Sequence, residues 1–173
     1  MKSLTFGWKI PGCLAILAGT LIFAVTAACA ATVVALGASN TYGKGVARNQ
    51  AFPAQLEAIL RAKGLNVRVI NAGINGDTTG GMLRRLGAVP KGARVVILQP
   101  GGNDRRKGTE ADRAASIAEI QSQLKGRGIR LIMLENNMLH GLPHQPDGQH
   151  LTPEGYRLLA ESLAAQVASA IGR

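Results

Sequence analysis

Cysteines and aromatic residues are scarce in this sequence of 173 residues, and their positions exclude several classes of fold and of binding partner. The two cysteines, Cys13 and Cys29, both fall within the first thirty residues. The rest of the chain therefore has no thiol for a disulfide scaffold, a cysteine nucleophile or a zinc ribbon. Its aromatic side chains are only Tyr42, Phe52 and Tyr156. Because single-stranded nucleic acids are bound by stacking on aromatic rings, a nucleic-acid partner is not expected.

Acidic residues are also few, with 10 Asp and Glu against 20 Lys and Arg, so the formal net charge is +10. This excess favours anionic substrates and is compatible with transient contact with a membrane surface. Apolar residues make up 46% of the chain and charged residues 17%, which excludes a disordered protein. The length fits one folded domain.

The N-terminal segment has the three parts of a secretory signal peptide. Residues 1–9 are basic without an acidic side chain, Leu14–Ala28 is an apolar run, and Ala28-Cys29-Ala30 is a small-x-small cleavage site. We therefore predict a signal peptide over 1–30, a folded domain over 31–173 and export, to the periplasm in particular. Two alternatives are an uncleaved N-terminal anchor and lipidation of Cys29.

Runs of apolar and β-branched residues alternate with segments of helical spacing. The strands are predicted over Thr32–Leu36, Val67–Ile70, Ala93–Leu98 and Ile129–Leu134. The helices are predicted over Asn49–Lys63, Thr78–Leu86, Thr109–Lys125 and Thr152–Ile171, the third of them burying Ala115, Ile117, Ile120 and Leu124. Such alternation implies parallel strands joined by right-handed crossovers. The expected fold class is α/β, a three-layer α/β/α sandwich with a parallel sheet of four to five strands.

Polar residues follow each predicted strand, where ligands bind in sheets of this kind. Ser39 follows the first strand, Gly76 lies after the second, Asn103 follows the third, and Asp147 and His150 precede the last helix. Acyl transfer needs a nucleophile, a base oriented by a carboxylate, and oxyanion donors. Ser39 is the candidate nucleophile, His150 the base and Asp147 its orienter. The candidate donors are the N–H groups of Ser39 and Gly76 and the Asn103 side-chain amide.

Two other groups of polar residues have competing interpretations. His140 and His144, with the candidate pair Asp147 and His150, suggest a metal site, but nearby prolines prevent the regular helix that a spaced His pair uses. We expect neither a metal nor a cofactor.

Two basic clusters remain. Arg105-Arg106-Lys107 either attracts anionic substrates to the site or is simply a solvated loop. Arg84 and Arg85 are predicted to form an exposed helix face.

Four ordered segments match one known pattern: Val33–Ser39, Asn71–Thr78, Gly101–Asp104 and Asp147–Tyr156. The chain thereby resembles the SGNH hydrolase superfamily of GDSL esterases and lipases, and within it the small bacterial thioesterases, lysophospholipases and arylesterases. The resemblance implies a flavodoxin-like SGNH fold. It also implies Ser39 as nucleophile, Gly76 and Asn103 as oxyanion donors, and Asp147 with His150 as the rest of the triad.

The chain departs from that pattern beside the serine and before the last helix. Ala38 stands where the pattern usually has Asp before the serine, and Asn40 stands where it usually has Leu after the serine. Only about a dozen residues separate Leu134 from Asp147, too few for another strand–helix unit, so a shallow acyl pocket is expected.

We therefore predict a secreted esterase or thioesterase that acts without a cofactor on small acyl substrates, some of them anionic. The resemblance suggests short- to medium-chain acyl esters, acyl thioesters or lysophospholipids. One alternative is a carbohydrate O-acetylesterase. Two others are a catalytically weak binding protein with the same fold and an anchored surface protein that holds anionic polymer. The oligomeric state is left open.

Overall fold

The structure, a computed structural model, describes residues 29–172. The predicted signal peptide, apart from its last two residues, lies outside the described residues, and so do the alternatives that depend on its apolar run. Within residues 29–172, no helix combines the length and apolar character that crossing a bilayer requires.

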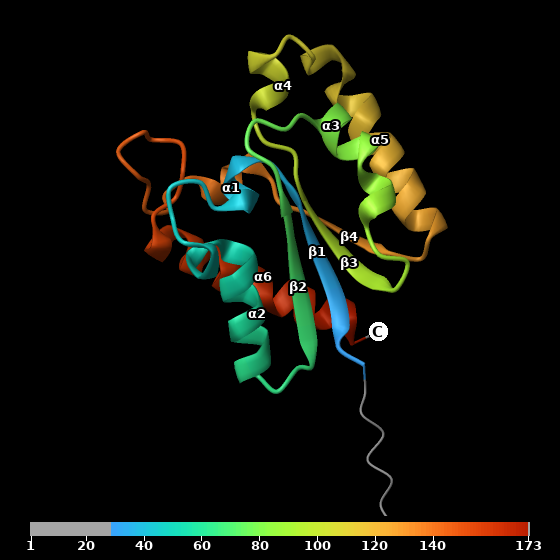
Figure 1. Cartoon of the computed structure of the whole chain (residues 1–173), viewed down its shortest axis with the longest axis vertical. Helices are drawn as coiled ribbons and strands as arrows, with labels where there is room; N and C mark the ends of the chain where they lie inside the picture. Colours follow the sequence, from blue (N-terminus) through green and yellow to red (C-terminus); the bar gives the residue numbers. More distant parts are fainter. Residues whose placement is uncertain (1–28, 173) are drawn as a thin grey trace, which may run out of the picture.

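A parallel sheet of four strands forms the middle layer, with the strand order β2-β1-β3-β4 (Figure 1). The strands are β1 (Ala31–Gly37), β2 (Val67–Gly73), β3 (Ala93–Gln99) and β4 (Arg130–Met133). In the register of the sheet, Gly37 at the end of β1 pairs with Gly73 of β2 and with Gln99 of β3. The carboxyl ends of the three strands therefore meet at one edge.

Helices cover both faces of the sheet (Figure 1). The helices that cover the sheet are α2 (Phe52–Ala62), the six-residue α3 (Thr79–Arg84), α5 (Glu110–Gly126) and α6 (Pro153–Ile171). The short ones are α1 (Ser39–Tyr42), α4 (Asn103–Arg106), and the 3-10 turns η1 (Arg48–Gln50), η2 (Leu86–Ala88) and η3 (Asn136–Leu139). Alternate residues of each strand point to opposite faces, so the core is divided in two. Val33 and Ala35 pack with α2 and α6, and Val34 and Leu36 pack with α3 and α5.

The predicted α/β class and its three layers are confirmed, with four strands in the sheet. Helix α6 begins as predicted, with Pro153 in the first turn and the Thr152 hydroxyl accepting the Gly155 N–H at 3.1 Å. The segment predicted as helix from Asn49 contains the 3-10 turn η1, and α2 starts only at Phe52.

The burial predicted for α5 is partly wrong. Ser116, Ile120 and Leu124 are its buried residues, whereas Ala115 is exposed and Ile117 only half-buried. Residues four apart lie on one face of a helix, and the row beginning at Ser116 is the one that faces the sheet.

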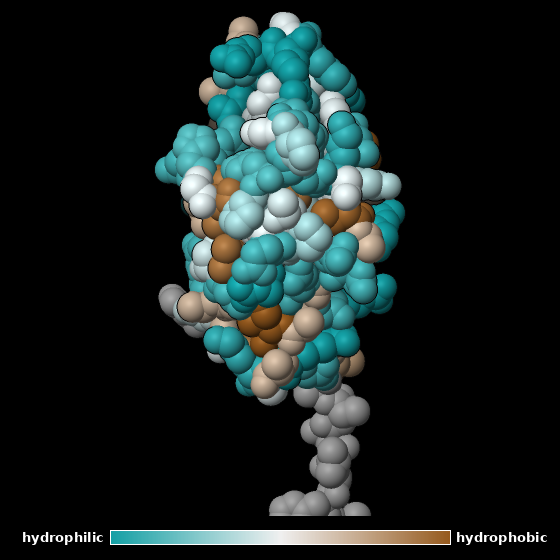
Figure 2. Space-filling model, turned by 90° about the vertical axis from the view of Figure 1, so that its left-hand side faces the viewer, coloured by the Kyte–Doolittle hydropathy of each residue, from teal (hydrophilic) through white to brown (hydrophobic). Residues whose placement is uncertain are grey.

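The surface seen in Figure 2 is mostly hydrophilic, with small and separate hydrophobic areas. Of the large hydrophobic side chains in the described part of the chain, Ile74 is the one classed as exposed, at 50%. This surface therefore offers no broad apolar face.

Candidate active site

Ser39 is the first residue of α1, a helix of four residues that follows β1 directly. Ala38 is the N-cap residue, and no side chain caps the helix there. The Ala38 carbonyl accepts the Tyr42 N–H at 2.9 Å, so the turn closes on its own backbone. The tight turn places the serine beyond the carboxyl edge of the sheet.

Three side chains lie in a row across this edge. The Ser39 hydroxyl oxygen is 2.9 Å from Nε2 of His150, and Nδ1 of the same ring is 2.5 Å from an Oδ2 oxygen of Asp147. The His150 side chain is buried at 4% exposure, whereas that of Asp147 is 46% exposed. The structure thus brings together the residues that the sequence predicted as nucleophile, base and orienting carboxylate.

Asp147 binds both the ring and the backbone of its own loop. Its Oδ1 oxygen accepts the backbone N–H groups of Gln149 and His150, each at 2.9 Å. The hydrogen bond with the His150 side chain, followed by these backbone bonds, holds the pKa of Asp147 well below its usual range. The carboxylate is therefore ionised, so it accepts a hydrogen bond from the Nδ1–H group and leaves the unprotonated Nε2 facing the serine.

The loop that carries this pair is fixed to the first turn of α6. The Thr152 N–H donates to the Pro143 carbonyl at 3.0 Å, and the Thr152 hydroxyl donates to the same oxygen at 3.3 Å. A Cβ at Gly155 would lie 2.3 Å from that oxygen, so this close approach needs glycine.

Asn103 is buried at the start of α4, and its amide is fixed at both ends. Its Nδ2 donates to the Asp77 carbonyl at 2.8 Å, and its Oδ1 accepts a hydrogen bond from Arg106. A carbonyl only accepts and a guanidinium only donates, so the amide orientation is unambiguous. Nδ2 retains a second hydrogen with no partner among residues 29–172.

Gly76, the other predicted donor, lies in the loop between β2 and α3 with a φ of +74°. Ser39 and Asn103 line one cavity, and Gly76 is not among the residues that line it. The cavity therefore brings two of the predicted donor residues together, and Gly76 lies outside its lining.

A buried carboxylate supports the turn that contains Asn103. Asp104 is 1% exposed and accepts the backbone N–H of Thr79 at 3.1 Å and its hydroxyl at 2.7 Å. These bonds join α4 to the start of α3.

The prediction that Arg84 and Arg85 form an exposed face is wrong for Arg85. Its side chain is 22% exposed and donates to the Asp77 carboxylate at 2.8 Å, the Ala72 carbonyl at 2.7 Å and the Gly37 carbonyl at 3.0 Å. A guanidinium has enough donors for all three, so Arg85 joins the ends of β1 and β2 to the following loop.

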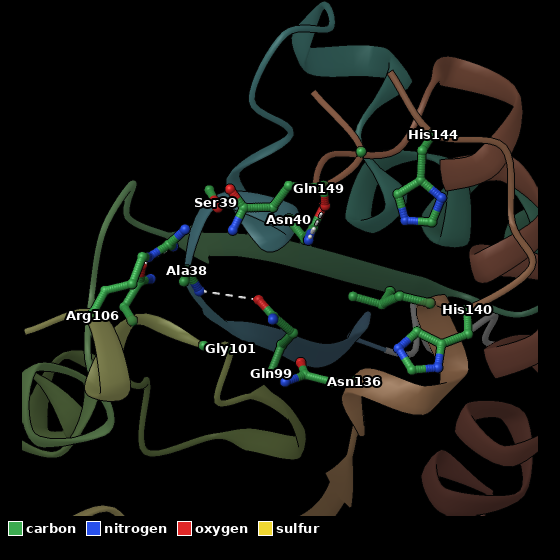
Figure 3. Close-up of a pocket in the computed structure, with 14 residues that line it drawn as sticks. Ala38, Ser39, Asn40, Gln99, Gly101, Arg106, Asn136, His140, His144 and Gln149 are labelled. Carbon is green, nitrogen blue, oxygen red and sulfur yellow. Dashed lines mark hydrogen bonds between the residues drawn. The ribbon is translucent and has the colours of Figure 1, made fainter. Parts of the chain in front are cut away.

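A cavity of about 240 Å³ adjoins the serine, and most of the residues that line it have polar side chains. Besides Ser39, the polar side chains are five amides, two imidazoles and one guanidinium: Asn40, Gln99, Asn103, Asn136, Gln149, His140, His144 and Arg106. Figure 3 shows His140 and His144 on the side of the cavity opposite Arg106. No carboxylate of the described chain lines it. A small ligand with hydroxyl, carbonyl or anionic groups would find partners there.

The two histidines of the suggested metal site lie on that cavity wall, and His144 Nδ1 is 2.7 Å from the Leu142 carbonyl. In the part of the chain that the structure covers, no three His, Cys, Asp or Glu side chains group as metal ligands would.

Residues 35–170 match the GDSL-like Lipase/Acylhydrolase family. The chain belongs to this family. It is 30% identical over 128 residues to Esterase TesA of Pseudomonas aeruginosa, covering 72% of this chain and 61% of the relative. It is also 30% identical over 120 residues to an arylesterase of Vibrio mimicus, covering 66% and 60%. The matches thus span about three-fifths of each curated relative.

Solved structures agree with the GDSL-like fold. The crystal structure of TesA gives a TM-score of 0.72 at 23% identity and covers 80% of this chain and 99% of that one. The crystal structure of AlinE4, an SGNH-hydrolase family esterase, gives a TM-score of 0.59 at 26% identity and covers 82% and 97%.

One hydrogen-bond network of this GDSL-like chain, centred on Asn40, was not predicted from the sequence. The buried Tyr156 hydroxyl donates to Asn40 Oδ1 at 3.0 Å, and Asn40 Nδ2 donates to the Gln149 carbonyl at 3.2 Å. Burial raises the pKa of Tyr156 to about 12, so its hydroxyl stays protonated. Asn40 therefore links the residue after the nucleophile to the loop of His150. The sequence signal that could have indicated this network is Asn40, which stands where the family pattern usually has Leu.

Proposed function

We propose that this GDSL-like chain is a serine hydrolase that cleaves ester bonds through an acyl-enzyme on Ser39. The observation that carries the proposal is the row from Ser39 through His150 to Asp147, with contacts of 2.9 and 2.5 Å. That row supplies a nucleophile, a base and an orienting carboxylate in the order that acyl transfer needs. The names of the two curated relatives, an esterase and an arylesterase, support the same reaction.

In the first half-reaction, His150 Nε2 takes the hydroxyl proton as the Ser39 oxygen attacks the substrate carbonyl. Asp147 stabilises the imidazolium that forms. The negative oxygen accepts hydrogen bonds from the Ser39 and Gly76 N–H groups and from Asn103 Nδ2. As the tetrahedral intermediate collapses, His150 returns the proton to the departing alcohol or thiol and the acyl group stays on the serine.

In the second half-reaction, water is the nucleophile. His150 takes one proton from it, the oxygen adds to the acyl carbonyl, and the serine leaves with the proton that His150 holds. A carboxylic acid and the free enzyme result, and no cofactor takes part.

The cavity favours a short acyl group and a polar substrate. A long hydrocarbon chain would cover amides and imidazoles without bonding to them, at a cost of about 1–3 kcal/mol for each unsatisfied group. We therefore rank short-chain esters and thioesters above medium-chain ones, and lysophospholipids last. Arg106, on the cavity wall, favours anionic substrates, whereas Arg105 and Lys107 do not line it.

A carbohydrate O-acetylesterase is the second candidate, and the polar lining is the observation that favours it. Sugar hydroxyls both donate and accept hydrogen bonds, as do amides and neutral imidazoles. An acetylated sugar would satisfy this wall better than a plain alkyl ester.

We further propose that residues 1–30 direct export to the periplasm and that 31–173 form the hydrolase domain. The net charge of +10 favours association with anionic surfaces. Membrane contact would be transient, because Ile74 is the one exposed large hydrophobic side chain among residues 29–172.

Hydrolysis of p-nitrophenyl acetate by the full chain, compared with Ser39→Ala, tests the reaction. We expect a loss on the order of 10⁴-fold or more in kcat. Ser162→Ala, a serine exposed on α6, is the matched control and should keep the wild-type rate. Equal rates for wild type and Ser39→Ala would refute the nucleophile.

A substrate panel tests the preference. We expect kcat/KM to fall from acetyl through butyryl and octanoyl to palmitoyl esters, and a preference for palmitoyl would refute the short-acyl proposal. A higher kcat/KM for an acetylated sugar than for the acetyl ester of p-nitrophenol would favour the carbohydrate esterase.

A further inference from the structure

The N–H group of the residue before the nucleophile has no hydrogen-bond partner within its own turn. Ala38 has no polar side-chain atom and is 2% exposed, packed in the core with Val34 and Leu36. Helix α1 has only four residues and no side-chain cap, so it cannot hold its own first turn firmly. Some other group must fix the backbone from which Ser39 projects.

Gln99 makes that connection from a distant strand. Its Oε1 oxygen accepts the Ala38 N–H at 3.2 Å and the Thr41 hydroxyl at 3.3 Å, as the dashed line to Ala38 in Figure 3 shows. Gln99 is 2% exposed and ends β3, opposite Gly37 in the sheet register. One buried amide therefore binds the residues before and after the Ser39–Asn40 pair.

The space for this contact exists because Gly37 has no side chain. A Cβ there would lie 2.1 Å from the Thr41 hydroxyl oxygen and 2.9 Å from the Gln99 Cβ. Distances this short exclude any larger residue without a shift of the turn. The glycine, the hydroxyl and the amide thus form one fitted unit at the strand end.

The other end of the same amide faces the substrate cavity. Because the Ala38 N–H only donates, the atom that meets it is the oxygen, which leaves Nε2 pointing away. Gln99 lines the cavity, and its Nε2 has no hydrogen-bond partner within residues 29–172. The side chain therefore contacts both the nucleophile turn and the space where the substrate would lie.

We propose that Gln99 is a positioning residue for Ser39. Its neutral amide supplies the hydrogen-bond acceptor that position 38 lacks and holds the serine at its distance from His150. This inference rests on the proposed ester hydrolysis. A misplacement of about 1 Å at a reacting atom costs up to about 10²-fold in rate, so loss of the Oε1 contacts should lower kcat.

Three variants of the full chain test this role with p-nitrophenyl acetate. Gln99→Met removes the acceptor at similar size, and Gln99→Glu keeps an acceptor oxygen. Gln55→Met is the control, because Gln55 bonds only to the Gln50 and Pro153 carbonyls outside the cavity.

We expect Gln99→Met to lower kcat by about tenfold or more with little change in KM. Gln99→Glu should recover most of that loss, and Gln55→Met should keep the wild-type kcat. Hydrogen exchange at the Ala38 amide should quicken in Gln99→Met and not in Gln99→Glu. If Gln99→Met does not fold, Thr41→Val removes one of the two contacts and should lower kcat in the same direction by less.

A wild-type kcat together with wild-type exchange in Gln99→Met would overturn the proposal. Equal losses in Gln99→Met and Gln99→Glu, or in Gln99→Met and Gln55→Met, would overturn it as well. These outcomes are distinct from failure of the proposed function, in which Ser39→Ala would hydrolyse as fast as wild type. The exchange measurement needs no substrate and tests the Gln99 contact by itself.

Discussion

On one side of the proposed site, Asp147 and His150 lie three residues apart in one loop and bind each other directly. On the other side, Ser39 and Asn103 depend on residues far along the chain. Ala38 is held by Gln99, 61 residues away, and Asn103 by Asp77, 26 residues away. The acid–base side is thus a local structure, whereas the nucleophile side is assembled by the folded sheet. Substitutions on the first side should reduce the rate with little change in stability, and those on the second should reduce both rate and stability.

The largest effect is expected for Asp147→Asn on the local side. The amide leaves His150 with the wrong tautomer and an unstabilised imidazolium, so kcat should fall by about 10²–10⁴-fold. The melting temperature should change little, because the side chain is 46% exposed. Steady-state kinetics and thermal unfolding of the same samples measure both. A large drop in Tm, or a rate within a few-fold of wild type, would contradict the comparison.

Asn40→Leu should affect the two sides together, because Asn40 links them. The buried Tyr156 hydroxyl would lose its acceptor, at a cost of about 1–3 kcal/mol in the free energy of unfolding. Urea unfolding measures this loss, and kcat should fall with it. Adding Tyr156→Phe removes the unsatisfied hydroxyl, so the double variant should be more stable than Asn40→Leu alone. No gain from the second substitution would show that the hydrogen bond is unimportant.

A several-fold loss in kcat is expected for Arg106→Met, because the Asn103 amide would lose the donor that fixes its oxygen. Arg105→Met removes the neighbouring charge without touching Asn103 and should keep the wild-type kcat with a neutral ester. With an anionic ester at low salt, Arg106→Met should also raise KM. Identical behaviour of the two variants would show that charge, and not contact with Asn103, is what matters.

The smallest effect concerns pH and stability. The folded-state pKa of Asp147 is depressed by His150, so its contribution to stability is present above the unfolded value of about 3.9 and is lost as pH falls further. The Tm difference between wild type and Asp147→Asn should therefore hold from pH 7 to about 4 and shrink below that. Calorimetry across this range measures it. A Tm difference that grows as the pH falls below about 4 would contradict the prediction.

Much of the acid–base side, formed by Asp147 and His150, could be predicted from the sequence. A carboxylate three residues before an imidazole, just ahead of a Thr-Pro helix start, specifies its geometry within one short segment. Ser39 was also predictable, because a buried apolar strand ends directly before it. These features depend on neighbours in sequence, which pattern reasoning sees.

The contacts on the nucleophile side could not be predicted from the sequence, because they depend on strand register. Nothing near Gln99 in the sequence shows that it lies opposite Gly37. Arg85 looked like an exposed helical residue, yet it meets carbonyl groups at the ends of two strands. The rotation of α5 about its axis, which buries Ser116 and exposes Ala115, was likewise decided by packing against the sheet.

The attachment of the Pro143–Thr152 loop to the first turn of α6 distinguishes the loop from the segment before it. The close contact at Gly155 ties the backbone at Pro143 to α6, whereas Asn136 and His140 of the preceding segment line the cavity. Exchange of the Asn136 or His140 side chain is therefore expected to change the cavity while the imidazole keeps its support. Substrate range can thus be varied at these two positions apart from the groups proposed to carry out the reaction.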